Sequence, residues 1–133
     1  MTLVDTSVWI DHFEHVDARL ADLMTNQLAA MHPFVIGELA AGSFKNRATT
    51  LGRLALMPQA PIAKEEEVHR LLESHRLWST GLGWVDLHLL TAALLMGWKL
   101  LTSDRAMKSA AQKLGIAHPE NSSGNPVSNP VST

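Results

Sequence analysis

Four acidic residues of this 133-residue chain have the type and spacing to act together on a metal ion: Asp5, Glu38, Asp86 and Asp104. Asp5 comes directly after a short apolar run at residues 2–4, and Asp104 follows a second run at residues 99–102. Carboxylates that converge in a partly desolvated pocket repel one another unless they share a proton, meet a basic group or bind a cation. Oxygen ligands suit Mg²⁺ or Mn²⁺, and such ions can promote the hydrolysis of a phosphodiester.

Three of these acids also have a purely structural interpretation. Asp is a frequent N-cap, which stabilises a helix by about 1 kcal/mol. Asp86 and Asp104 both stand at predicted helix starts, so the sequence leaves capping open beside a catalytic role. Asp5 differs because Thr6 and Ser7 follow it and either could cap the same helix. This favours a functional role for Asp5.

Glu38 is the acid that is hardest to explain by local structure. It lies in the middle of a predicted helix and shares a face with Phe34 and Ala41, so we expect it to be half-buried. A carboxylate on an apolar face needs a partner. A metal ion is one such partner.

The elements that must position the acids alternate along the chain. Strands are expected at residues 2–5, 29–31, 60–63, 99–102 and 116–118, and helices at residues 6–13, 17–28, 33–40, 46–57, 65–74, 87–96 and 105–114. This alternation predicts an α/β protein, a three-layer α/β/α domain with a short central parallel sheet. The carboxyl ends of parallel strands meet at one edge, which receives Asp5 and Asp104. The helix that begins at Asp86 runs antiparallel to the strand it precedes, so its first residues lie near the same edge.

Composition limits the classes of protein that remain. Hydrophobic residues make up 46% of the chain and charged residues 18%, which predicts a folded domain at residues 1–118. The absence of cysteine excludes disulfides and thiolate metal sites. A net charge of −2 argues against a protein that coats nucleic acid, although it allows a local basic rim. Residues 119–133 are rich in Pro, Ser and Asn, which predicts a flexible tail.

We expect neither a targeting segment nor a membrane-spanning segment in this sequence. Its N-terminus carries acids and no basic leader, unlike a secretory signal. The longest apolar run, residues 87–98, is too short for a bilayer core of about 30 Å. We therefore expect a cytoplasmic protein that does not bind membranes.

Four segments around the acids, in chain order, resemble the PIN-domain ribonucleases, most of all the VapC toxins of bacterial toxin–antitoxin pairs. They read LVDTSVWID, FVIGELAAG, GWVDLHLLTAALLMG and LLTSDRAMKSAAQKLGI, and span residues 3–116. The resemblance implies a PIN-like fold and a Mg²⁺- or Mn²⁺-dependent endoribonuclease, with the four acids as catalytic, metal-binding residues. It implies Thr6 and Thr102 as hydroxyl supports near the substrate. It also implies a homodimer and a cognate antitoxin that blocks the acidic pocket.

Positive charge gathers around the last acid. Lys99, Arg105, Lys108 and Lys113 stand against a single acid, Asp104, between residues 99 and 114. They could hold RNA phosphates beside the pocket, and Arg105 is the best placed to do so. The alternative for each of them is a place on a solvated helix face.

Other functions remain open on the sequence. An aspartyl-phosphate phosphatase also begins with an Asp after its first strand, but the second acid it needs is replaced here by Ser7, two positions after Asp5. A non-catalytic α/β interaction module, with the acids as caps, is the other alternative. No glycine-rich phosphate-binding motif occurs. A catalytic histidine is not expected, because His88 lies about 200° round the helix from Asp86.

Overall fold

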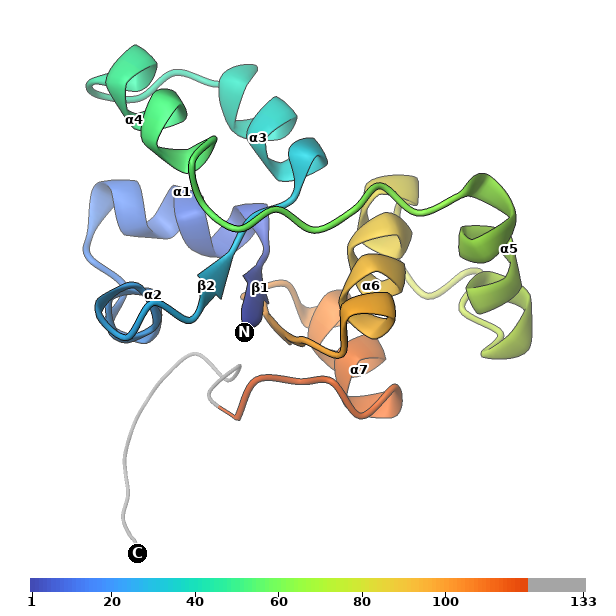
Figure 1. Ribbon diagram of the computed structural model, residues 1–133. Coiled ribbons are helices and arrows are strands. Elements are labelled where there is room, and N and C mark those ends of the chain that lie inside the picture. The colour runs from blue at the N-terminus through green and yellow to red at the C-terminus, as the bar shows by residue number, and fades with distance from the viewer. Residues whose placement is uncertain (120–133) are drawn as a thin grey trace, which may run out of the picture.

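The structure is a computed structural model, and it describes residues 1–119. Within these residues the sheet has three strands, β1 (Thr2–Val4), β2 (Ala29–Ala30) and β3 (Lys99–Leu101). Their order is β2-β1-β3, and both neighbours pair with β1 in parallel (Figure 1). The predicted tail lies, from residue 120 onward, outside the described residues.

Helices pack on both sides of this short sheet. Their bounds are α1 (Thr6–Glu14), α2 (Ala18–Thr25), α3 (Pro33–Ala40), α4 (Arg47–Leu54), α5 (Glu65–Ser74), α6 (Trp84–Met96) and α7 (Arg105–Lys113). In Figure 1, α1 and α2 lie on one side of the strands, and α6 lies on the other with α5 beyond it. The predicted three-layer α/β/α fold is therefore confirmed.

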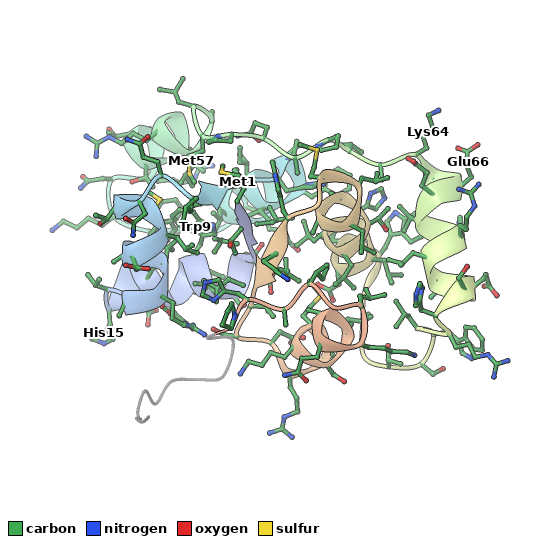
Figure 2. The ribbon with its side chains drawn as sticks, turned by 60° about the horizontal axis from the view of Figure 1, so that its bottom comes forward. Met1, Trp9, His15, Met57, Lys64 and Glu66 are labelled. Atoms are coloured by element: carbon green, nitrogen blue, oxygen red, sulfur yellow. The ribbon has the colours of Figure 1, made fainter. Side chains whose placement is uncertain are left out.

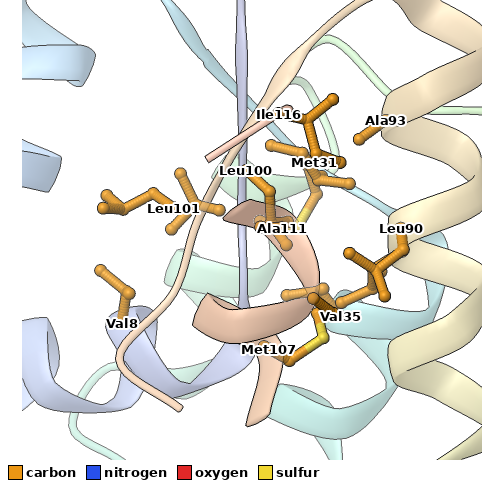
Figure 3. Packing of buried hydrophobic residues seen from close by; sticks show 14 of the residues in the cluster. Val8, Met31, Val35, Leu90, Ala93, Leu100, Leu101, Met107, Ala111 and Ile116 are labelled. Carbon is orange, nitrogen blue, oxygen red and sulfur yellow. The ribbon is translucent and has the colours of Figure 1, made fainter. Parts of the chain in front are cut away.

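Side chains of β3 alternate between the two halves of the core. Leu100 and Leu101 are both fully buried. Figure 3 shows Leu101 beside Val8 of α1, whereas Leu100 lies on the side of Leu90 from α6. Because successive residues of a strand point to opposite faces, a strand of three residues suffices to join both helical layers. This packing fixes the carboxyl end of β3, where the chain turns towards Asp104.

The edges of the molecule contrast with this interior. Trp9 is 2% exposed and lies inside the fold, whereas Lys64 and Glu66, at the start of α5, project outward (Figure 2). No helix found within residues 1–119 combines the length and the apolar character that crossing a membrane requires.

Two helix ends are set by local chemistry. Pro33 occupies the first turn of α3, where a missing N–H costs nothing, and Nδ1 of His32 accepts the N–H of Phe34 at 2.9 Å. At the other end of the fold, Gly97 stops α6 with a φ of 69°, a conformation that favours glycine. The chain then enters β3 directly.

The strand predicted at residues 60–63 does not form. In its place, a single bridge joins Gln59 to Met31 beyond the end of β2. Pro58 and Pro61 flank this bridge, and neither has an N–H to donate to a strand ladder. The segment therefore runs beside the sheet without extending it.

The strand predicted at residues 116–118 is likewise reduced to one bridge, between Leu100 and Ala117. Its two flanking hydrogen bonds are nevertheless made. The N–H of Leu100 donates to Ile116, and the N–H of His118 donates back to Leu100, at 2.8 and 2.9 Å. The end of the described chain is thus held against the outer side of β3.

Candidate active site

Asp5 sits where β1 ends and α1 begins, and it is only 5% exposed. Its Oδ2 accepts hydrogen bonds from Oγ1 of Thr102 at 2.7 Å and from Oγ of Ser7 at 3.0 Å. Burial raises the pKa of the Asp5 carboxyl, and the nearby charge of Asp86 raises it further, while the two hydroxyl bonds oppose both. Asp5 is thus a buried carboxyl whose negative charge is only partly compensated.

The hydroxyls that follow Asp5 do not cap α1, contrary to the sequence-based interpretation. Asp5 occupies the N-cap position without a side-chain capping bond. Thr6 instead donates from Oγ1 to Oε1 of Glu38 at 2.5 Å. Ser7 turns the other way, towards Asp5. Both hydroxyls therefore serve the acids rather than the helix end.

A hydroxyl network ties the start of α7 to the end of β1. The N–H of Ser103 donates to Oγ of Ser7 at 3.1 Å, and the N–H of Asp104 donates to Oγ1 of Thr102 at 3.0 Å. Thr102 itself is fully buried. The loop that carries Asp104 is therefore positioned by the same side chains that hold the carboxylate of Asp5.

Asp104 caps α7, which confirms the structural role that the sequence left open beside a catalytic one. Its Oδ2 accepts the N–H of Met107 at 2.9 Å. Among residues 1–119 no group donates a hydrogen bond to its Oδ1, and the side chain is exposed. Capping therefore leaves one carboxylate oxygen of Asp104 free for a ligand.

The sequence predicted that Asp86 begins the helix, but Asp86 is the third residue of α6. The helix begins at Trp84 because Gly83, in an extended conformation, takes the N-cap position. Oδ2 of Asp86 accepts the N–H of Gly83 at 2.9 Å. Burial raises the pKa of Asp86, and the charges of Asp104 and Glu38 raise it further, against the bond from Gly83. This carboxyl lies within electrostatic reach of all three other acids.

Glu38 is exposed, and the prediction of a half-buried side chain is wrong. The buried stripe of α3 passes through Val35 and Leu39, so Glu38 lies beside that stripe and not on it. Its partner in the described chain is the hydroxyl of Thr6, not a basic group. Water can reach this carboxylate, unlike that of Asp5.

The donor set matches a hydrated divalent cation. Within residues 1–119 none of the four acids forms an ion pair with a Lys, Arg or His side chain. Nor do any three acidic or histidine side chains of this part gather closely enough to hold one ion together. Mg²⁺ commonly keeps several waters and takes only one or two carboxylates plus substrate phosphates. Four separated carboxylates, none of them ion-paired with a basic side chain of residues 1–119, are compatible with that mode of binding.

The basic residues near Asp104 fall into two groups. Lys99 and Lys113 each donate to a backbone carbonyl, at 3.3 and 2.6 Å. The side chains of Arg105 and Lys108 make no hydrogen bond or ion pair with other groups of residues 1–119. Arg105 is exposed on the first turn of α7, directly after Asp104.

Two residues that the sequence did not single out also reach the site. The sequence indicates Ser7 as a possible helix cap. Its position two residues after Asp5 also allows its hydroxyl to bond that carboxylate, as it does in the structure. Arg19 donates from Nη2 to Oγ of Ser103 at 3.0 Å while it pairs with Asp17 at 2.7 Å. No local pattern indicates this contact, since 84 positions separate Arg19 from Ser103.

His88 belongs to the packing around α6. It is 4% exposed, and its ring contacts those of Phe34 and Trp84, with centroids 4.8 and 5.0 Å apart. The ring is thus packed against aromatic side chains of α3 and α6.

Comparison with known proteins gives two findings. The PIN domain model matches residues 2–113. The chain is 48% identical over 118 residues to Ribonuclease VapC32 of Mycobacterium tuberculosis, in strains CDC 1551 / Oshkosh and ATCC 25618 / H37Rv, covering 88% of this chain and 95% of the relative. Together with the acids that follow β1, lie in α3 and α6 and precede α7, these matches show that the chain belongs to the PIN-domain family, among its VapC-type ribonucleases.

Proposed function

We propose that this chain is a Mg²⁺- or Mn²⁺-dependent endoribonuclease and the toxin of a bacterial toxin–antitoxin pair. The observation that carries the proposal is the convergence of four carboxylates from separate elements, Asp5, Glu38, Asp86 and Asp104, without a basic partner in residues 1–119. The curated relatives are named ribonucleases, and nucleases of this family use divalent metal ions.

Each acid has a distinct part in this proposal. Asp5, Asp86 and Asp104 hold the cation directly or through water, and Glu38 completes its shell. When bound, the cation supplies a water of lowered pKa and neutralises charge on the phosphate. Glu38 is exposed and accepts the proton of the attacking water. Burial, and after it the charges of the neighbouring acids, raises the pKa values of Asp5 and Asp86, so a bound cation would offset both the burial of these carboxylates and their mutual repulsion.

The hydroxyl and basic residues divide between positioning and substrate contact. Thr102 is fully buried and bonded to Asp5, so we assign it to holding the acids rather than to touching RNA. Thr6 holds Glu38 at the surface of the site, where RNA can reach it. Arg105, exposed beside Asp104, contacts a phosphate of the substrate.

The partners follow from the relationship to VapC-type proteins. A cognate antitoxin that covers the acidic pocket, a homodimeric state and a cytoplasmic location are parts of the same proposal. The competing function is a non-catalytic interaction module, in which the acids serve only as caps. Asp5 argues against that function, because its carboxylate is buried and makes no capping bond.

The test is cleavage of a mixed cellular RNA pool by the purified chain. The reactions contain Mg²⁺, Mn²⁺ or EDTA, and the variant Asp104→Asn runs beside the wild type. Asp11→Asn is the matched control, because Asp11 is an exposed acid of α1 that belongs to no part of the site. We expect cutting by the wild type and the control with either metal, and none with EDTA or with Asp104→Asn.

Each other pattern has a clear meaning. Cleavage that persists in Asp104→Asn at the wild-type rate would remove this acid from the mechanism. Cleavage that persists in EDTA would reject the metal. If no reaction cuts RNA although the antitoxin has been removed by denaturation and refolding, the chain is not a ribonuclease and the interaction module is favoured.

A further inference from the structure

A groove of about 320 Å³ opens beside the acidic site, between α1 and the segment that follows α3. The residues that matter in its lining are Ile10, Phe13, Glu14, Glu38, Phe44 and Lys45. Glu38 lines the groove and also belongs to the four acids. The groove therefore adjoins the acidic site at Glu38.

One face of α1 leads from the acids into the groove. Ile10 lies four residues after Thr6, which is one helical turn or about 6 Å further along the same face. Thr6 is bonded to Glu38 at the site, and Ile10 lines the groove. Stacked nucleotides rise about 3.4 Å each, so the distance from site to groove is about two nucleotide steps.

The walls of the groove suit a flat, uncharged group. Phe13 and Phe44 stack on each other with centroids 4.5 Å apart and an interplanar angle of 17°. Ile10 is 49% exposed and lines the groove, so its side chain can contact a bound group. A volume of about 320 Å³ is at the small end of ligand pockets and leaves room for one planar group rather than an extended one.

The charges on the lining disfavour an anion inside the groove. Glu14 and Glu38 bring two carboxylates, and Lys45 brings one cation. A phosphate or an acidic peptide would meet net repulsion there, whereas a neutral base would not. At the rim, Lys45 can hold a phosphate of the same nucleotide chain.

We propose that this groove binds one unpaired base of the RNA substrate, within about two nucleotides of the phosphate that reacts at the acids. The proposal rests on the proposed ribonuclease function and adds a specificity site to it. Single-stranded RNA offers such bases, and stacking of a base on an apolar or aromatic surface stabilises the complex whatever its sequence.

The first experiment measures binding, so that it does not depend on cleavage. The inactive variant Asp104→Asn is titrated into fluorescently labelled oligoadenylate and into an abasic chain of the same length, and the anisotropy gives both Kd values. We expect oligoadenylate to bind about tenfold more tightly than the abasic chain. Adding Ile10→Ala or Phe44→Ala should bring the two Kd values close together by weakening only the binding of oligoadenylate.

Leu95→Ala provides the matched control. Leu95 is 52% exposed on α6, close to the exposure of Ile10, and lies outside the groove. This variant should keep the full difference between the two chains. The melting temperature of each variant shows whether it is folded, and Ile10→Ala keeps the test valid if Phe44→Ala fails to fold.

The second experiment uses an RNA that the wild type cuts once, with a single abasic nucleotide placed in turn on either side of the cut. At one of these positions, the abasic nucleotide should lower the kcat/KM of the wild type about tenfold relative to intact RNA. The same RNA should not lower the kcat/KM of Ile10→Ala. Equal Kd values and equal kcat/KM values for intact and abasic RNA would overturn the groove while leaving the ribonuclease intact. A further outcome is that Ile10→Ala and Phe44→Ala keep the difference in Kd between oligoadenylate and the abasic chain but no longer bind the antitoxin. That result would identify the groove as an antitoxin site and would also overturn the proposal.

Discussion

The hydroxyl of Thr102 donates a 2.7 Å hydrogen bond to Oδ2 of Asp5, although 97 positions separate the two residues. The hydroxyl oxygen of Thr102, Oγ1, also accepts the N–H of Asp104 at 3.0 Å. One buried hydroxyl therefore acts as donor to the first acid and as acceptor for the backbone of the last. The relative placement of these two acids depends on it.

Thr102→Val should separate this positioning role from ordinary packing. The change removes both hydrogen bonds, so we expect kcat/KM for RNA to fall about 10–100-fold and the free energy of unfolding to fall by about 1–3 kcal/mol. Thr91→Val is the control, because Thr91 is 5% exposed and its hydroxyl, among residues 1–119, bonds only the carbonyl of Leu87 in its own helix. It should lose some stability and keep its activity. Wild-type cleavage by Thr102→Val would contradict the assignment.

Asp5→Asn should abolish cleavage and stabilise the metal-free fold. Burial raises the pKa of Asp5 above its usual 3.8, so the folded state binds a proton more readily than the unfolded state. Stability from this group is therefore greatest at low pH and is lost as the pH rises through the raised pKa. Removing the charge should raise the melting temperature at pH 7 without metal. A lower melting temperature, with Asp11→Asn unchanged, would show that the carboxylate stabilises the fold.

Divalent metal should stabilise the wild-type protein more strongly at alkaline than at mildly acidic pH. A ligand that binds only the folded state raises its stability by mass action. The cation competes with protons for Asp5 and Asp86, whose pKa values are raised, so it should bind more tightly as the pH rises. Thermal unfolding with and without Mn²⁺ measures the effect. Asp86→Asn should lose most of it, and an undiminished shift in that variant would exclude Asp86 as a ligand.

Acid should weaken the fold through His32. Burial lowers the pKa of this imidazole from 6.5 to about 4, with a smaller contribution from the charge of His88. The stability that His32 provides is complete above pH 6.5 and is lost as the pH falls towards 4, by about 3 kcal/mol in all. His32→Asn keeps an acceptor for the N–H of Phe34 but does not titrate. Denaturant unfolding at several pH values in this range gives the free energy of unfolding as a function of pH. We expect this free energy to change less with pH in His32→Asn than in the wild type. An equal pH dependence in the two proteins would refute the assignment.

The strand ends explain why two of the acids could be placed from the sequence. Residues 2–4 and residues 99–102 are short apolar runs, each with an acid soon after, and a parallel sheet brings such acids to one edge. The structure pairs these runs directly as β1 and β3. The parallel pairing of these two strands is therefore enough to predict that Asp5 and Asp104 lie near each other.

The remaining features depend on tertiary contacts that no local pattern encodes. The orientation of Glu38 is set by which stripe of α3 is buried and by a hydroxyl 32 positions away. The shift of the start of α6 follows from Gly83 taking the cap, where Asp86 was an equally good candidate by residue type. The bond from Ser103 to Ser7 spans 96 positions. Such contacts form only once the layers have packed.

The central place of β1 has a consequence for the synthesis of the protein. The first strand of the chain pairs with β3, so Asp5 gains its donor from Thr102 only after translation has passed that residue. At about 5–20 residues per second, a nascent chain on the ribosome spends seconds with its first acid made and its last acid absent. In the proposed mechanism, which needs all four acids, the ribonuclease activity therefore appears only after residue 104 has been made.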